Sequence, residues 1–199
     1  MRGLFVTFEG IDRSGKTTQS GLLCEALGDE ALGVREPGGT EVGERVRELL
    51  KDPAAAMSPE AEALLFAAAR SELVAEVILP ALETGKVVVS DRFLDSSLAY
   101  QGGARGLGID EVERVNHFAT RGLKPDLTFL LDLSPEDAAA RAGESDRFEE
   151  AGAGLQEAVG TAYERLVRAD PDRWRRIDAR QSPGDVHAQV LASVKAARE

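Results

Sequence analysis

The chain has 199 residues, with 24 Lys and Arg against 35 Asp and Glu, which gives a formal net charge of −11 at pH 7. This length suits one well-packed domain, so we expect residues 1–199 to form a single domain. DNA, RNA and anionic membranes require a basic face on their partners, so the acidic balance argues against nucleic-acid and membrane binding, and no apolar run approaches the length of a transmembrane helix.

Short apolar runs alternate with longer helical patterns along the chain, which predicts βαβ units, in which a parallel sheet is covered by helices on both faces. Five strands are expected, at residues 4–8, near Val34, and at 87–90, 128–133 and 176–178. The three valines at 87–89 form a continuous apolar run, which is typical of a parallel strand buried on both faces. The predicted fold is therefore a three-layer α/β/α arrangement around a five-stranded parallel sheet.

Serine followed by proline marks three expected helix starts, because serine can cap free amide groups and proline suits the first helical position, where its missing N–H costs nothing. These serines are Ser58, Ser134 and Ser182. Apolar residues spaced three and four apart between Leu155 and Val167 predict another helix with one buried stripe. Glycine-rich stretches at 102–108 and 143–154 are expected to be mobile loops.

The clearest functional signal is a phosphate-binding loop, which matches G-x-x-x-x-G-K-[ST] between the first expected strand and a helical pattern. Its residues are Gly10, Ile11, Asp12, Arg13, Ser14, Gly15, Lys16 and Thr17, and Thr18 follows directly. In such a loop, main-chain N–H groups point at phosphate oxygens and the positive end of the next helix faces them. Lys16 is expected to reach the outer phosphates of ATP, and the Thr17 hydroxyl is expected to bind Mg²⁺.

A loop of this kind needs an acidic partner at the end of a neighbouring buried strand, which holds the metal and its waters. Two aspartates qualify, because Asp91 follows the strand expected at 87–90 and Asp132 lies near the end of the run at 128–133. Asp91 is preferred because Arg92 beside it would add a cation that faces phosphate. The sequence therefore predicts Thr17 and Asp91 as the metal-binding pair.

Phosphoryl transfer also requires positive charge around the migrating group. The arginines expected to supply it are Arg13 in the loop, Arg92, Arg141, and Arg147 in the glycine-rich stretch at 143–154. A switch GTPase is the main competing class, and it reads guanine with an N-K-x-D motif. That motif is impossible here, because Asn116 is the only asparagine and His117 follows it.

Six motifs in order along the chain together resemble the thymidylate kinase family. They are FEGID at 8–12, REPGGT at 35–40, LLFAAAR at 64–70, DRF at 91–93 with DSSLAYQG at 95–102, GLKPD at 122–126, and DRFE at 146–149. The resemblance covers nearly the whole chain, from Phe8 to about Asp178. It implies a P-loop nucleoside monophosphate kinase fold with a short lid, about residues 142–154, and transfer of the γ-phosphate of MgATP to dTMP.

The resemblance also implies roles for the residues of the acceptor site. Asp12 would hold the sugar 3′-hydroxyl of dTMP, Phe66 would stack on thymine, and Arg70 would donate to the O4 edge of the base. Tyr100 would occupy the place of a 2′-hydroxyl and so select deoxyribose. Further acceptor-binding residues are Ser96 or Ser97 at the base, Arg92 between acceptor and transferred phosphate, Pro37 after an expected cis peptide, and Glu36 and Gln101 from the matched motifs.

On the donor side, the family pattern implies that Arg141 stacks on adenine and that Arg147 closes over the phosphates with the lid. Some members use a catalytic arginine in the P-loop and others use lid arginines. Since this chain has both Arg13 and Arg147, the sequence leaves open which of them dominates.

The expected protein is thus a thymidylate kinase that forms a homodimer through helices, including one at residues 109–121. A kinase for another nucleoside monophosphate is the nearest alternative, and an ATP-binding regulator without catalysis is a more distant one. The single cysteine, Cys24, cannot form an internal disulfide or a cysteine-rich metal site, so a reducing cytoplasm is the expected compartment.

Overall fold

The computed structural model describes residues 2–141 and 153–198. Arg147 and nearly all of the lid expected at 142–154 lie outside the described residues, so their predicted roles stay predictions. None of the described helices is long and apolar enough to cross a membrane.

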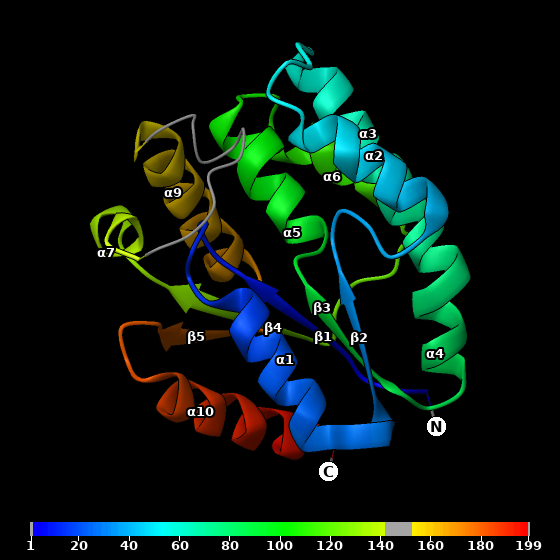
Figure 1. The fold of residues 1–199 in the computed structure, drawn as a ribbon, viewed down its shortest axis with the longest axis vertical. Helices are drawn as coiled ribbons and strands as arrows, with labels where there is room; N and C mark the ends of the chain where they lie inside the picture. Colours follow the sequence, from blue (N-terminus) through cyan, green and yellow to red (C-terminus); the bar gives the residue numbers. More distant parts are fainter. Residues whose placement is uncertain (1, 142–152, 199) are drawn as a thin grey trace.

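Within the described part of the chain, five parallel strands form one sheet in the order β2-β3-β1-β4-β5 (Figure 1). The strands are β1 (Phe5–Glu9), β2 (Ala31–Arg35), β3 (Val87–Asp91), β4 (Leu127–Asp132) and β5 (Trp174–Asp178). The five-stranded parallel sheet predicted from the sequence is confirmed. β1, at its centre, is fully buried, and the ring of Phe8 stacks on that of Phe129 from β4, with ring centroids 5.2 Å apart.

Helices cover both sides of the sheet, as the alternating pattern predicted. On one side, α1 (Lys16–Leu27) lies against α10 (Pro183–Ala196) (Figure 1). The other described helical segments are η1 (Gly28–Glu30), α2 (Glu41–Lys51), α3 (Pro59–Leu73), η2 (Val74–Ile78), α4 (Leu79–Glu83), α5 (Leu94–Ser97), η3 (Leu98–Ala104), α6 (Ile109–Ala119), α7 (Pro135–Ala139) and α9 (Ala153–Ala169). Of these, α3, η3, α6 and α9 pack together on the opposite side.

The three helix starts predicted from Ser-Pro pairs are confirmed. The hydroxyls of Ser58, Ser134 and Ser182 each accept a hydrogen bond from the main-chain N–H three residues later, at the starts of α3, α7 and α10. The apolar stripe predicted on the helix at 155–167 is also buried in α9, where Val159 and Tyr163 are almost inaccessible to solvent.

The loop expected at 102–108 is partly wrong, because its first residues belong to the π-helix η3. One glycine there serves close packing, because a Cβ on Gly103 would lie 2.5 Å from the Cβ of Ala162 on α9. Two helices can approach this closely only where one lacks a side chain. Gly103 is therefore a packing residue between η3 and α9.

Candidate active site

The P-loop joins the end of β1 to the start of α1, in the context that the motif requires. Gly10 has a φ of 139°, and a Cβ there would lie 2.7 Å from the carbonyl oxygen of Leu131, so only glycine fits. Lys16 Nζ donates to the carbonyl oxygens of Ile11 at 2.7 Å and Gly10 at 3.2 Å. Burial, and then the charge of Arg92, lower the pKa of Lys16 to about 8. A buried ammonium group with a second cation near it favours the binding of an anion.

Successive pairs of residues in and after the loop line two different cavities in turn. The loop therefore lies between the two cavities. The first cavity, of about 310 Å³, includes Asp12, Arg13, Lys16 and Thr17 in its wall. The second cavity, of about 360 Å³, is lined by Ser14, Gly15, Thr18, Gln19, Leu131, Arg141, Ala179, Gln181, Pro183 and Val186. Gly10 and Ile11 line neither and instead supply the carbonyl groups that hold Lys16.

Every residue that the sequence assigned to the acceptor lies in the wall of the first cavity. These residues are Asp12, Glu36, Pro37, Phe66, Arg70, Arg92, Ser96, Ser97, Tyr100 and Gln101. The peptide bond between Glu36 and Pro37 is cis, as expected. The structure thus brings together side chains from the P-loop, the segment after β2, α3, the end of β3, α5 and η3.

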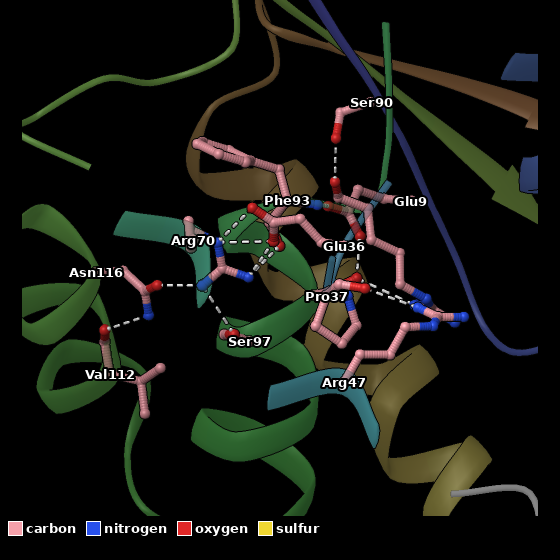
Figure 2. A network of polar contacts seen from close by, with 12 residues as sticks. Glu9, Glu36, Pro37, Arg47, Arg70, Ser90, Phe93, Ser97, Val112 and Asn116 are labelled. Atoms are coloured by element: carbon pink, nitrogen blue, oxygen red, sulfur yellow. Dashed lines mark hydrogen bonds and ion pairs between the residues drawn. The ribbon is translucent and has the colours of Figure 1, made fainter. Parts of the chain in front are cut away.

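Four further residues line this cavity that sequence reasoning missed: Arg35, Arg47, Leu50 and Lys51. Arg47 Nη1 donates to the carbonyl oxygen of Pro37 at 2.8 Å (Figure 2). Arg47 and Lys51 are four residues apart on α2, which follows the Thr40 cap, so they share one face of the helix. Two basic residues spaced four apart are the sequence signal from which Arg47 and Lys51 could have been predicted.

Thr17 and Asp91 meet where α1 begins and β3 ends, since Thr17 Oγ1 donates to Asp91 Oδ2 at 2.5 Å. The alternative aspartate, Asp132, instead accepts from Arg176 Nε at 2.9 Å. No cluster of three metal-binding side chains exists within residues 2–141 and 153–198. One hydroxyl and one carboxylate are what a Mg²⁺ site shared with phosphates and waters requires of a protein, so this corner fits that ion.

Arg92 follows β3 in a left-handed conformation, with a φ of 71°, which is strained for a residue with a side chain. Hydrogen bonds on both sides hold it there: Ser90 Oγ donates to the Arg92 carbonyl at 2.6 Å, and the N–H of Phe93 donates to Glu9 Oε1 at 2.9 Å. The guanidinium consequently projects into the first cavity, where it donates to Asp12 and to Ser96 Oγ at 3.0 Å. Its carbon lies 5.2 Å from the centroid of the Tyr100 ring.

Asp12 is held from two sides, by Arg92 and by Gln156 of α9. Gln156 Nε2 donates to Asp12 Oδ2 at 2.8 Å, and the N–H of Asp12 donates to Gln156 Oε1 at 3.3 Å. Burial alone would raise the pKa of Asp12, but the charges of Arg92 and Lys16 outweigh it and hold the pKa below its ordinary value. Gln156 was not predicted, because nothing in the sequence links positions that are 144 residues apart.

Glu9 is completely buried beneath Arg92, and its Oε2 accepts from Ser96 Oγ at 2.6 Å and Tyr163 Oη at 2.7 Å. Burial, and then the negative charge of Asp95, raise the pKa of Glu9 to about 7. Glu9 therefore supports the Arg92 turn through Phe93 and the Arg92 side chain through Ser96. Sequence reasoning included Glu9 in a family motif but gave it no role.

Arg70 is fully buried in a network that uses all three of its guanidinium nitrogens (Figure 2). Nη2 lies 2.5 Å from Glu36 Oε2 and donates to the Phe93 carbonyl at 3.1 Å, and Nε lies 2.8 Å from Glu36 Oε2. Nη1 donates to Ser97 Oγ at 3.1 Å and to Asn116 Oδ1. The guanidinium plane is thus fixed at the cavity wall before any ligand binds.

Arg141 follows α7 and reaches back to the P-loop. Its Nη1 donates to the carbonyl oxygen of Arg13 at 3.0 Å, and Arg13 Nη1 donates to the carbonyl oxygen of Arg141 at 3.2 Å. A second hydrogen bond, from Arg141 Nη2 to the Ala179 carbonyl at 2.5 Å, fixes the plane of the guanidinium in the wall of the second cavity. A planar cation held this way can stack on an aromatic base.

Comparison with known proteins gives a consistent result. The family model described as thymidylate kinase matches residues 8–190. A thymidylate kinase of Thermoanaerobacter sp. (strain X514) is 48% identical over 200 residues, which cover 98% of each chain. One of Pelotomaculum thermopropionicum is 49% identical over 207 residues, covering 100% of this chain and 94% of the relative. The crystal structure of thymidylate kinase from Ehrlichia chaffeensis is 32% identical, with a TM-score of 0.83, and the match covers 98% of this chain and 100% of that one.

Proposed function

The chain belongs to the thymidylate kinase family, and we propose that its first cavity binds dTMP while its second cavity binds the adenine of ATP. The protein is an ATP-dependent nucleoside monophosphate kinase, which transfers the γ-phosphate of ATP to dTMP and yields dTDP and ADP. The observation that carries the assignment of cavities is the P-loop between them. A phosphate chain gripped by that loop extends from one cavity to the other.

On the donor side, main-chain N–H groups of residues 10–18 and the Lys16 ammonium bind the phosphates of ATP. Arg141 stacks on the adenine ring. Support for this role comes from its fixed guanidinium plane at the second cavity. Mg²⁺ is held by Thr17 and Asp91, whose side-chain oxygens converge, and when bound it neutralises charge on the phosphates.

On the acceptor side, Phe66 stacks on thymine, and Arg70, Ser96, Ser97 and Gln101 face the base edge. Asp12 accepts from the 3′-hydroxyl, and Tyr100 fills the space that a ribose 2′-hydroxyl would need. Arg92 binds the acceptor phosphate, and the position of Arg47 and Lys51 in the cavity wall supports a share of that task. Glu36 and Pro37 form the wall behind the phosphate, with Glu36 also locking Arg70.

Catalysis needs no covalent intermediate, because positioned cations suffice for phosphoryl transfer. The acceptor phosphate oxygen attacks the γ-phosphorus in line, and ADP leaves. Arg13 and Arg92, which both line the first cavity, neutralise the charge that develops on the transferred group, and Arg147 joins them from the lid at about residues 142–154. The whole chain acts as one kinase domain.

We further propose that the protein is a cytoplasmic homodimer, with α6 in the interface. Phe118 on α6 is 88% exposed, and Leu64 on α3, which packs against α6, is 57% exposed. Apolar side chains this open mark a protein–protein interface when they gather on neighbouring helices. The lone Cys24 suits a reducing compartment.

The acceptor assignment is tested by measuring ADP production with dTMP, dUMP, dCMP and dGMP in turn, in the presence of ATP and Mg²⁺. We expect the highest kcat/KM with dTMP. A higher value with another monophosphate would identify a kinase of different specificity, and ATP binding without transfer to any acceptor would identify a regulator. A Lys16→Ala variant that stays folded should lose the activity.

A further inference from the structure

Glu62 is a buried carboxylate next to the first cavity that the roles above do not use. It lies on α3 and is 2% exposed, and its Oε1 accepts from Gln101 Nε2 at 2.9 Å. Arg105 Nε approaches the same oxygen at 3.4 Å, from a side chain that is 29% exposed. Gln101, on η3, is itself 2% exposed and lines the cavity, whereas Glu62 does not. Glu62 therefore contacts a residue of the cavity wall, Gln101, without lining the cavity itself.

The contact has a chemical consequence for the Gln101 amide. A side-chain amide has a donor end, Nε2, and an acceptor end, Oε1, and it can present either end to a ligand by rotation of its last torsion. An ionised carboxylate can only accept hydrogen bonds, so Glu62 requires the donor end of Gln101. The end that remains for a ligand in the cavity is then the acceptor, Oε1.

A hydrogen-bond donor, the Ser97 hydroxyl, is present in the same cavity wall as the Gln101 acceptor. Arg70 Nη1 donates to Ser97 Oγ at 3.1 Å, which leaves the Ser97 hydroxyl to donate its own proton. The wall thus offers a hydrogen-bond donor at Ser97 and an acceptor at Gln101. Thymine matches this order, because its O4 accepts and its N3–H donates. Cytosine reverses both groups, since its 4-amino group donates and its N3 accepts.

We propose that Glu62 is a positioning residue that fixes which end of the Gln101 amide faces the acceptor base, and that it thereby makes the site select thymine over cytosine. The inference rests on the dTMP site proposed above. When a buried donor faces a donor of the ligand, or an acceptor faces an acceptor, both polar groups stay without a hydrogen bond. The free-energy cost of those unsatisfied groups is how such sites reject an analogue. Without the carboxylate, the Gln101 amide can rotate and present its donor end to cytosine N3.

The test compares kcat/KM for dTMP and dCMP in the parent and in Glu62→Gln, which keeps the size of the side chain but can donate as well as accept. We expect the ratio of dTMP to dCMP to fall roughly tenfold or more. The loss with dTMP should lie mainly in KM, since Glu62 touches no reacting group. Glu60→Gln is the matched control, because Glu60 is exposed on the same helix, and its ratio should equal that of the parent.

A double-mutant cycle distinguishes a purely structural role of Glu62 from the proposed orientation of the Gln101 amide. In a Gln101→Ala background, Glu62→Gln should change the ratio no further, because there is no amide left to orient. Thermal unfolding checks that each variant is folded. Glu62→Asp serves as a second variant, since it keeps the charge near Arg105 but withdraws the carboxylate from Gln101, and it should lower the ratio in the same direction.

An unchanged ratio in either folded Glu62 variant would overturn the proposal, as would an equal effect of Glu62→Gln with and without Gln101. The parent enzyme in the same panel distinguishes this failure from failure of the acceptor assignment. If the parent prefers dTMP while the variants keep that preference, only the role of Glu62 is wrong.

Discussion

Thr17 and Asp91 lie 74 positions apart in the chain and share a hydrogen bond of 2.5 Å between the Thr17 hydroxyl and Asp91 Oδ2. The contact joins the P-loop to the end of the neighbouring strand, β3. Because the two oxygens are already in contact, both could coordinate one Mg²⁺ ion directly or through its waters.

Asp91→Asn should therefore weaken the response to Mg²⁺. Loss of a group that holds the metal or its waters typically costs 10–100-fold in metal affinity, so we expect the half-saturating Mg²⁺ concentration to rise by about that factor. The measurement is the initial rate with dTMP and ATP across a Mg²⁺ titration. Asp132→Asn is the control, because Asp132 is paired with Arg176, and a larger effect there than at Asp91 would reverse the assignment.

Arg13→Ala should lower kcat by about 10³-fold or more, which is the scale of an arginine that neutralises charge in phosphoryl transfer. Arg13 lines the first cavity and has a φ of 62°. Arg121→Ala is a matched control, because Arg121 also has a positive φ, of 54°, but lies outside both cavities. Near-normal turnover of Arg13→Ala, with a large loss in Arg147→Ala, would transfer the role to the lid.

Glu9 should make the protein less stable as the pH rises from about 4.5 to about 7. Burial raises its pKa from 4.5 to about 7, so in this range the folded state holds a proton that the unfolded state has lost. The unfolded chain binds fewer protons there, and the free energy of unfolding consequently falls with pH. Below pH 4.5 the contribution is fully present, and above pH 7 it is gone.

Glu9→Gln removes this titration. The free energy of unfolding of the variant, measured by urea denaturation from pH 4 to pH 8, should decline less between pH 4.5 and pH 7 than that of the parent. The exposed Glu157→Gln change on α9 is the control and should give a curve parallel to the parent. If Glu9→Gln also runs parallel to the parent, the pKa of Glu9 is not raised.

Phe118→Glu should convert the proposed homodimer to a monomer. A charge in the centre of an apolar interface is desolvated without a partner, which opposes association. Light scattering at micromolar concentration measures the mass, and we expect a dimer for the parent and for Ala192→Glu, an exposed position on α10 across the sheet. A monomeric parent contradicts the proposal directly.

Several features of this protein could be predicted from the sequence because they depend on residues close together in the chain. The P-loop needs glycines, a lysine and a threonine within one short segment, and the apolar runs before and after it identify strand and helix. The serine caps act over three residues, so Ser58, Ser134 and Ser182 could be recognised directly. The resemblance to a family added the cis peptide at Pro37 and a set of residues that line the first cavity together, which local patterns alone do not reveal.

Only the tertiary structure decided which of these residues touch. The Gln156–Asp12 and Glu62–Gln101 hydrogen bonds join side chains from different helices and loops, and no spacing in the sequence encodes them. Gly103 looked like part of a loop because its packing partner, Ala162, lies 59 positions away in the chain. Such pairs depend on how the crossovers place helices over the sheet. Short-range patterns therefore determined the elements and the phosphate loop, whereas packing across the sheet determined the orientation of the groups around it.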